Sequence, residues 1–594
     1  MINPALDQTL IVTSSVVQGR TRPVGLDEAV EAGRNRIVLV AVTFLVLFAV
    51  LSVRLFGLAV SGARDHSFIS ASSEPDLPRA DILDRRGTLV ATDVGAFAAY
   101  ADPSRIWDAA EAADRITGVL ARVDRDRLFE RLSRKSTRFV WVERELTPRE
   151  RYEVHNLGLP GIDFMRERKR FYPHGTVLSH VVGYTTIDGK GIAGAELAFD
   201  PLIRGRTQAD APVRLSVDLR VQHALHQELA SALDRFRARS AAGVVLDVRT
   251  GEVMGMVSLP DFDPNAPGEA GPARHFNRVV GGVYELGSTL KAFTIAAALD
   301  SATVSLLDGF DATHPIKVGR HQIRDFHPKR RFLTVPEIFR YSSNIGTAKM
   351  AIAMGLETQK DYLDRFGLLE RPPFELKETA RPITPERWGE LQRMTVSFGH
   401  GIAISPLQLS VGGAALVNGG CLPRPTLISA MDPPGSCARA VTPATSRIML
   451  DLMRAVVVEG TGKRADVEGY PVAGKTGTAE KARDGGYDQR AILSSFMGVF
   501  PANDPAYVVL VVLDEPKPTE ETFNLATAGW TAAPLVGRIV ARIAPMLGVP
   551  PVLAPSGAGH EGRDRSARRV PLDEPVTGGL STPRRGARAS TRNG

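Results

Sequence analysis

Three short motifs carry side chains that could perform acyl transfer. Ser288 and Lys291 lie three residues apart in YELGSTLKAFT at 284–294, a spacing that places both on one face of a helix. A serine hydroxyl needs a base to become a nucleophile, and a lysine can be that base only if its pKa is depressed. A helix start at Gly287 would also direct backbone N–H groups toward the reacting centre. Alone, Ser-x-x-Lys is a weak signal, because about one chance occurrence is expected in this chain.

Two further motifs follow the serine. YSSN at 341–344 supplies the hydroxyl of Ser342 and the amide of Asn344, which could face one cleft. AGKTGTAEK at 473–481 supplies four candidate binding residues: Lys475, Thr476, Gly477 and Thr478. The ordered set Ser-x-x-Lys, Ser-x-Asn and Lys-Thr-Gly, behind a membrane anchor, is highly specific for a serine acyl-transfer enzyme.

The last motif has two interpretations. As a strand, it would direct Lys475 and Gly477 to one face and the two threonines to the other, and the glycine would let a substrate backbone approach closely. Residues 469–476, GYPVAGKT, also fit the phosphate-binding P-loop pattern. A P-loop needs a preceding strand and a following helix, whereas RADVE precedes the motif and two glycines soon follow it. We therefore predict a strand.

An apolar segment near the N-terminus predicts a membrane anchor. Residues 37–53 contain no charged side chain, and after Arg54 the apolar sequence continues to residue 60. A helix over 37–60 would measure about 36 Å, enough to cross a bilayer, and the arginine could snorkel to the headgroups. A cleaved signal peptide would be shorter and would start earlier. Four arginines precede the segment, so we expect the N-terminus to lie in the cytoplasm.

Length and composition limit the remaining possibilities. The 594 residues are too many for one core and suggest two to four domains. The net charge of +7 is small for this length, so nucleic-acid binding is not expected. The two cysteines, Cys421 and Cys437, exclude a disulfide-stapled scaffold and a thiolate metal cluster, and no cofactor or metal is expected. Whether they form a disulfide or remain two buried thiols stays open.

Apolar runs predict the main elements of a large α+β domain. Strands are expected at 241–248 and 252–259, and again at 492–500 and 507–513, with mainly helical text between these two pairs. An amphipathic helix is expected at 529–547. Strands at both ends of the segment imply one sheet built from distant parts of the chain.

On these motifs, the sequence resembles the class B penicillin-binding proteins. The resemblance covers about residues 79–545 and includes five further matches: RADILDRRG at 79–87, KRFYPHGTVLSHVVGYTTIDGKGIAGAE at 169–196, LPDFDPN at 259–265, SFGHGIAISPLQL at 397–409 and EGTG at 459–462. The glutamate of YELGSTLK, the phrase FDPN and the ending KTGTAEK are most similar to the septal FtsI family. Leu286, Leu290 and His400 depart from its usual residues.

The resemblance implies a fold and a domain order. The fold is that of penicillin-binding proteins and serine β-lactamases, an antiparallel sheet flanked by helices, after a transmembrane helix and an α+β pedestal. The implied ranges are a cytoplasmic segment at 1–36, a transmembrane helix at 37–60, a periplasmic pedestal at 61–216, a transpeptidase domain at 217–550 and a disordered Arg-rich tail at 551–594. No polymerase domain is expected.

The resemblance also implies a serine-type D-Ala-D-Ala transpeptidase of the inner membrane. Ser288 would be the nucleophile, Lys291 the base and Ser342 a proton relay. Asn344 would bind the substrate amide, and Lys475, Thr476 and Thr478 the terminal carboxylate. Implied partners are peptidoglycan stem peptides, β-lactams, a SEDS-type glycan polymerase and divisome membrane proteins. The alternatives are an elongation-specific transpeptidase, a penicillin-binding sensor and a β-lactamase.

Overall fold

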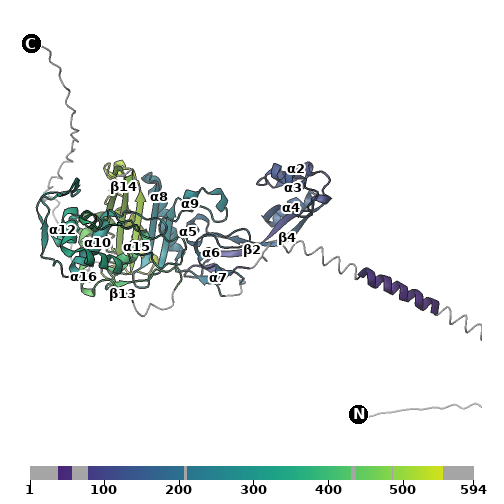
Figure 1. Ribbon diagram of the computed structural model, residues 1–594, viewed down its shortest axis with the longest axis horizontal. Coiled ribbons are helices and arrows are strands. Elements are labelled where there is room, and N and C mark those ends of the chain that lie inside the picture. Colours follow the sequence, from purple (N-terminus) through teal and green to yellow (C-terminus); the bar gives the residue numbers. More distant parts are fainter. Residues whose placement is uncertain (1–37, 56–77, 206–210, 430–436, 484–485, 553–594) are drawn as a thin grey trace, which may run out of the picture. The chain divides into compact units, whose positions relative to one another are not determined.

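The structure, a computed structural model, describes residues 38–55, 78–205, 211–429, 437–483 and 486–552 (Figure 1). The predicted cytoplasmic segment, the stalk before residue 78 and the tail from residue 553 lie outside these ranges. Val38–Leu55 is an 18-residue helix with none of its surface buried. It is the one helix among the described residues that is long and apolar enough to cross a membrane, and it lies within the predicted range 37–60.

The described chain forms two compact units. The first contains Gly95–Lys169 and Ile187–Gly189, and the second contains Arg79–Val94, Arg170–Thr186 and the chain from Lys190 onward. Segments from the predicted pedestal therefore pack with the large C-terminal unit. The predicted domain ranges rest on the family resemblance, whereas the two compact units rest on packing. The predicted ranges therefore stay a prediction.

The first unit is a small α+β layer. Its elements are α2 (Ala109–Val119), α3 (Arg125–Leu132), β3 (Val140–Leu146), α4 (Pro148–Asn156) and the parts of β2 (Leu89–Ala101) and β4 (Ile162–Phe171) that lie in it. Asp108, Asp124 and Thr147 accept hydrogen bonds from the first-turn N–H groups of the three helices. Asp124 caps the start of α3, which explains why residues 109–133, whose sequence is helical in pattern, form two helices rather than one.

The second unit is built on a five-stranded antiparallel sheet. Its strand order is β14 (Ala473–Arg483), β15 (Gly486–Phe500), β16 (Tyr507–Asp514), β6 (Ser240–Asp247) and β7 (Val253–Leu259). The first and last parts of the domain thus meet in one sheet, as predicted, and β14 lies at its edge. These strands and their flanking helices confirm the predicted α+β class.

Helices cover both faces of this sheet (Figure 1). Val509, Val511 and Leu513 face a core that includes α8 (Leu219–Arg235) and α17 (Ala532–Met546). Val508, Leu510 and Val512 face the other core, which includes α10 (Lys291–Asp300) and α15 (Pro406–Ala415). Because both faces of β16 are covered, its sequence is continuously apolar, without alternation between apolar and polar residues.

The remaining elements surround this core. The longer helices are α11 (Val335–Tyr341), α12 (Asn344–Met354), α13 (Leu356–Arg365), α14 (Glu390–Ser397) and α16 (Pro443–Val458), and the short ones are α5 (Ser179–Val182), α6 (Gly194–Ala198), α7 (Asp200–Ile203) and α9 (Pro272–His275). The short strands are β1 (Ile82–Leu83), β5 (Val213–Arg214), β8 (Gly309–Asp311), β9 (Ile316–Val318), β10 (His321–Ile323), β11 (Phe332–Thr334), β12 (Cys421–Leu422) and β13 (Ala438–Arg439).

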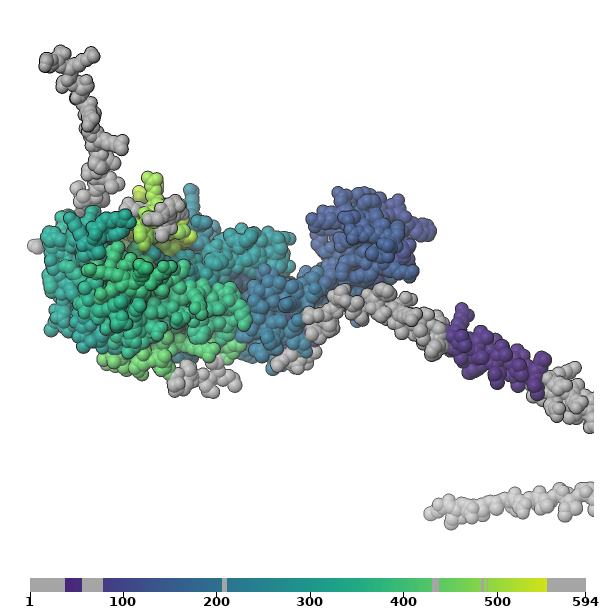
Figure 2. Space-filling view, in the orientation of Figure 1, coloured from purple at the N-terminus to yellow at the C-terminus, as the bar shows by residue number. Residues whose placement is uncertain are grey.

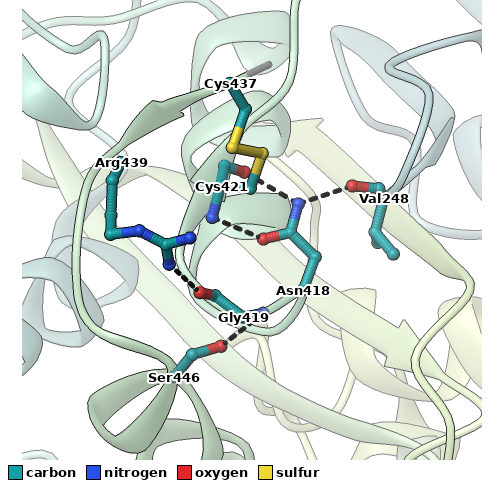
Figure 3. Close-up of a disulfide and its surroundings, with 7 residues drawn as sticks. All are labelled: Val248, Asn418, Gly419, Cys421, Cys437, Arg439 and Ser446. Carbon is teal, nitrogen blue, oxygen red and sulfur yellow. Dashed lines mark hydrogen bonds between the residues drawn. A yellow bond between two sulfur atoms is a disulfide. The ribbon is translucent and has the colours of Figure 1, made fainter. Parts of the chain in front are cut away.

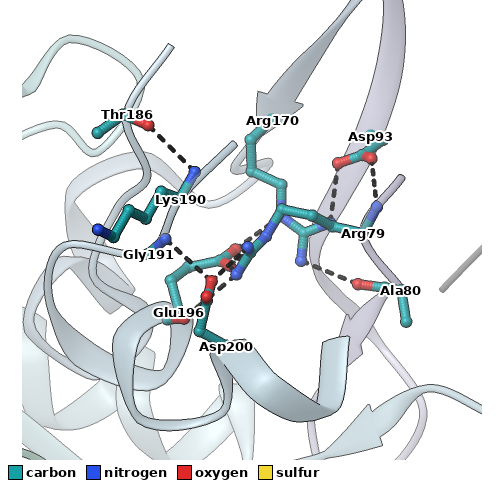
Figure 4. A network of polar contacts seen from close by, with 9 residues as sticks. All are labelled: Arg79, Ala80, Asp93, Arg170, Thr186, Lys190, Gly191, Glu196 and Asp200. Atoms are coloured by element: carbon teal, nitrogen blue, oxygen red, sulfur yellow. Dashed lines mark hydrogen bonds and ion pairs between the residues drawn. The ribbon is translucent and has the colours of Figure 1, made fainter. Parts of the chain in front are cut away.

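A buried ionic network joins the two N-terminal boxes of the family resemblance (Figure 4). Nε of Arg79 donates to Glu196 at 3.0 Å, and Nε of Arg170 donates to the other oxygen of Glu196 at 2.6 Å. Asp93 and Asp200 accept from the outer nitrogens of these arginines. The glutamate is fully buried, so loss of either arginine would leave a buried charge with one partner fewer, which typically costs about 3–5 kcal/mol.

The two cysteines form a disulfide (Figure 3). It joins Cys421 in β12 to Cys437, across a separation of 16 residues. Asn418 holds the turn before the bond: its side chain accepts from the N–H of Cys421 at 2.9 Å and donates to the carbonyl of Val248 at 2.6 Å. The alternative of two free thiols, which the sequence left open, is therefore excluded.

Candidate active site

Ser288 lies in a tight turn at the start of α10. The turn is a 3-10 helix, Gly287–Leu290, and Lys291 begins the α-helix directly after it. Gly287 has a φ of +57°, and a Cβ there would lie 2.8 Å from the carbonyl oxygen of Thr478. Only glycine fits this turn, because it combines a left-handed backbone with close contact to β14. The turn thus brings the serine beside the Lys-Thr-Gly strand.

Four of the predicted residues meet around the amine of Lys291. Its Nζ lies 3.0 Å from Oγ of Ser288, 3.0 Å from Oγ of Ser342 and 2.5 Å from the carbonyl oxygen of Ser342. Nζ of Lys475 donates to the same Ser342 hydroxyl at 2.9 Å. Three segments separated by up to 187 residues, counted from 288 to 475, therefore converge on one hydroxyl.

Ser342 occupies a strained position that serves this geometry. It ends α11 with a φ of +61°, in the left-handed region that residues other than glycine seldom adopt. Such backbone conformations cost about 1–3 kcal/mol and persist where the surrounding structure fixes them. The conformation presents both the carbonyl and the hydroxyl of Ser342 to the lysine amine.

Burial depresses the pKa of both lysines. The side chains of Lys291 and Lys475 have no exposed surface. Burial, and then the charge of Lys475, holds the pKa of Lys291 well below its usual value, while Asp325 acts in the opposite direction. Burial lowers the pKa of Lys475 to about 7. The neutral amine that a lysine base requires is thus favoured at Lys291.

The Lys-Thr-Gly residues alternate across β14. Lys475 and Gly477 face Ser342 and Leu286, whereas Oγ1 of Thr476 lies 2.6 Å from Oγ1 of Thr461 and Oγ1 of Thr478 accepts from the N–H of Ala528. This alternation excludes the P-loop interpretation, because the motif lies inside a strand. The predicted approach of a substrate backbone to the glycine stays a prediction, and the structure adds a second reason for a glycine here. A Cβ at Gly477 would lie 2.4 Å from the carbonyl oxygen of Leu286, so the glycine also accommodates the protein's own backbone.

Asn344 begins α12, next to the lysine cluster but outside it. Its Nδ2 donates to the carbonyl of Arg324 at 2.9 Å, which fixes the orientation of the amide. Asp325, a residue that the motif search missed, holds the same turn: its carboxylate accepts from Oγ of Ser343 at 2.8 Å and from the N–H of Ile345 at 2.9 Å. Its one sequence signal is that it is the single acid in a strongly basic segment.

Glu285, the glutamate of YELGSTLK, lies three positions before the serine, and sequence reasoning assigned it no chemical role. One carboxylate oxygen accepts from the N–H of Gly401 at 2.9 Å and from the hydroxyl of Tyr487 at 3.4 Å, and the other is buried without a partner. Burial raises the pKa of Glu285. His400, noted as a departure from the family, packs its ring against Tyr487, and burial lowers its pKa to about 4. The nucleophile turn is thereby tied to β15.

Among the described residues, no group of three or more His, Cys, Asp or Glu side chains is arranged to hold a metal ion. The polar atoms at the centre of the site belong to two lysines and two serines. A hydroxyl beside a buried amine is suited to nucleophilic attack on a carbonyl carbon.

Family comparisons agree with this geometry. The penicillin binding protein transpeptidase domain matches residues 241–540, and the penicillin-binding protein dimerisation domain matches residues 76–208. The chain therefore belongs to the penicillin-binding proteins, and its pair of domains is that of class B. A solved structure, a peptidoglycan synthetase from Bifidobacterium adolescentis, shares the fold with a TM-score of 0.63 at 22% identity, covering 81% of this chain and 97% of that one.

Within this class, the chain is similar to FtsI. It is 42% identical over 484 residues to the "Probable peptidoglycan D,D-transpeptidase FtsI" of Caulobacter vibrioides, covering 79% of this chain and 82% of that protein. It is 30% identical over 516 residues to the "Peptidoglycan D,D-transpeptidase FtsI" of Escherichia coli K12, covering 81% and 86%. The resemblance to the septal family is thereby confirmed.

Proposed function

We propose that this protein is a peptidoglycan D,D-transpeptidase that cross-links stem peptides during septal wall synthesis through an acyl-enzyme on Ser288. The observation that supports this most directly is the contact of 3.0 Å between the Ser288 hydroxyl and the buried Lys291 amine. The similarity to FtsI proteins supports the septal role. The donor is a stem peptide that ends in D-Ala-D-Ala, and β-lactams act as its mimics.

Acylation begins with transfer of the Ser288 proton to the neutral amine of Lys291. The serine oxygen then bonds to the carbonyl carbon between the two D-alanines. A neutral lysine has two N–H groups and one lone pair. Its two N–H groups satisfy the carbonyl and hydroxyl of Ser342, so the lone pair is left for the proton of Ser288.

The developing oxyanion is stabilised by the backbone N–H groups of Ser288 and Thr478. Close contact between Gly287 and the Thr478 backbone supports this assignment. Removal of one such donor typically lowers the rate by about 10²–10³. Because β14 is an edge strand, a peptide can also extend the sheet there through backbone hydrogen bonds.

Collapse of the tetrahedral intermediate breaks the C–N bond and releases the terminal D-Ala. Ser342, which contacts both lysines, passes the proton from Lys291 to the leaving amine. Asn344 binds the substrate amide, and Lys475, Thr476 and Thr478 bind the terminal carboxylate, with Gly477 placing this strand against the nucleophile turn. An amine of a second peptide then attacks the ester, forms a 3,4-type cross-link and restores Ser288.

The apolar helix Val38–Leu55 fits a single-pass membrane anchor. We propose that the N-terminus is cytoplasmic and that both compact units lie in the periplasm. The disulfide supports this orientation, because disulfides persist in oxidising compartments. A SEDS-type glycan polymerase and divisome membrane proteins are the proposed partners in the inner membrane.

A fluorescent penicillin tests this function on the full-length protein in detergent. We expect a long-lived covalent adduct on the wild type and none on Ser288→Ala. Rapid loss of the label would indicate a β-lactamase instead, and the absence of any adduct on the wild type would reject the proposal. Transfer of a stem-peptide donor to an amine acceptor separates a transpeptidase from a penicillin-binding sensor.

A further inference from the structure

We propose that residues 317–331, here called the basic segment, form a binding surface for the carboxylates of a peptidoglycan strand beside the active site. This inference rests on the proposed function. The segment holds six cations, all exposed: Lys317, Arg320, Arg324, Lys329, Arg330 and Arg331. Asp325 is its one acid, so these 15 residues carry a net +5, compared with +7 for the whole chain.

The segment begins as a hairpin whose apolar face is buried. Strands β9 and β10 pair in antiparallel fashion, and Ile316, Val318 and Ile323 pack on a small core with residues of α12 and α14. Lys317 lies between two of these inward-facing residues, so its side chain lies on the opposite face. Arg320 follows the glycine of the turn and is exposed. Packing thus fixes the hairpin with its cations toward solvent.

The second half of the segment is bonded to the catalytic turn. Asp325 accepts hydrogen bonds from Ser343 and Ile345, and the carbonyl of Arg324 accepts from the side chain of Asn344. Ser343, Asn344 and Ile345 directly follow Ser342, at the start of α12. A ligand held by the basic segment would therefore lie next to the residues proposed to hold the substrate amide.

Most of this charge has no counter-charge among the residues that the structure describes. Arg331 pairs with Glu337 at 2.6 Å, but Lys317, Arg320 and Arg330 form no ion pair with any described residue. Asp325 is already bonded to the turn. Like charges gathered in one segment repel each other, and an anionic partner would relieve that repulsion.

The surface also has apolar contact area among the cations. Phe326 is 74% exposed and Phe332 is 54% exposed. Arginine together with exposed aromatic side chains is typical of binding interfaces. A peptidoglycan strand matches this composition, because its stem peptides carry free carboxylates on a peptide backbone. A phospholipid headgroup or a lipid-linked pyrophosphate is also anionic, and the experiment below separates these sources.

The test measures co-sedimentation of the full-length protein, in detergent, with purified sacculi. One arm uses sacculi whose stem-peptide carboxylates are free, and a second uses sacculi whose carboxylates are amidated. A third arm replaces the sacculi with vesicles that contain phosphatidylglycerol. A fourth arm adds inorganic pyrophosphate as a competitor. The variant is Arg320→Glu/Arg330→Glu, and the control is Arg447→Glu, an exposed arginine of α16 without an ion pair to any described residue.

We expect the double variant to bind free-carboxylate sacculi roughly tenfold more weakly than wild type at low salt, and the control to bind like wild type. Binding should weaken with added salt and with amidation. Two results would overturn the inference. One is that the double variant binds free-carboxylate sacculi as tightly as the wild type. The other is that the double variant differs from the wild type only in binding to the vesicles or only in the competition by pyrophosphate. Penicillin labelling of Ser288 should be equal in all three proteins. Absence of labelling in the wild type would instead count against the proposed function.

Discussion

Replacement of Lys475 by methionine removes the cation nearest to the proposed base while preserving the length of the side chain. In the wild type, the charge of Lys475 is the second cause, after burial, of the depressed pKa of Lys291. Without it, the pKa of Lys291 rises, and the neutral amine persists only at higher pH. We therefore expect the acid limb of the pH–rate profile for penicillin acylation to move to higher pH.

The size of this effect follows from the geometry. Both amines bond to the hydroxyl of Ser342, at 3.0 and 2.9 Å, so the two nitrogens lie at most about 6 Å apart. With an effective dielectric constant of about 20, two unit charges at this distance repel by about 3 kcal/mol, equal to about 100-fold in an equilibrium. The difference should be largest below the pKa of Lys475, about 7, where this lysine is charged.

The assay is the acylation rate at saturating penicillin from about pH 5 to about pH 9. The shape of each profile is compared, because loss of carboxylate binding lowers the rate of the variant at every pH. Lys481→Met is the matched control: it removes the same charge from the same strand, but Lys481 pairs with Asp514 and Glu515 instead of the site. An acid limb that stays in place, or moves to lower pH, would refute the electrostatic role of Lys475.

Three further outcomes are expected. Lys475→Met should raise the melting temperature above that of the wild type near pH 7, and this difference should narrow toward pH 10. The reason is that the unfolded wild type binds more protons than the folded one between the folded pKa of Lys475, about 7, and its unfolded pKa, so the wild type gains stability as the pH rises. A wider gap at high pH would contradict this. Cys421→Ser should lower the free energy of unfolding by about 3 kcal/mol, and reductant should destabilise the wild type to a similar degree in denaturant titrations. Gly287→Ala should slow acylation by about 100-fold, whereas Gly158→Ala, at a φ of +60° with open space around its Cβ, should leave the rate unchanged.

The local amino-acid sequence predicted the helices and strands of the site but not the contacts between them. The strand at 507–513 and the helix at 529–547 could be predicted because their apolar patterns are long and uninterrupted, and the structure has them at Tyr507–Asp514 and Ala532–Met546. The order of the three catalytic motifs was likewise visible. Their convergence on Ser342 depends on packing between distant segments, which motif spacing alone does not determine.

The residues whose roles sequence reasoning missed act through such long-range contacts. Asp325 bonds residues about 20 positions away, and Glu285 contacts Tyr487 across 202 positions. Asp325 belongs to no motif with a fixed spacing, and the motif YELGSTLK, which contains Glu285, does not indicate the distant contacts of that glutamate. Gly477 was predicted as an important position, but its contact with the carbonyl of Leu286 could be known only from the packing of β14 against the nucleophile turn.

The most direct test of the central mechanism is the intact mass of the full-length protein mixed with a stem-peptide donor that ends in D-Ala-D-Ala. The mechanism predicts a mass gain equal to the donor minus one D-Ala, located on the peptide that contains Ser288. Addition of an acceptor amine should remove this adduct and release a cross-linked product. An adduct on another residue, or product formation by Ser288→Ala, would contradict the mechanism.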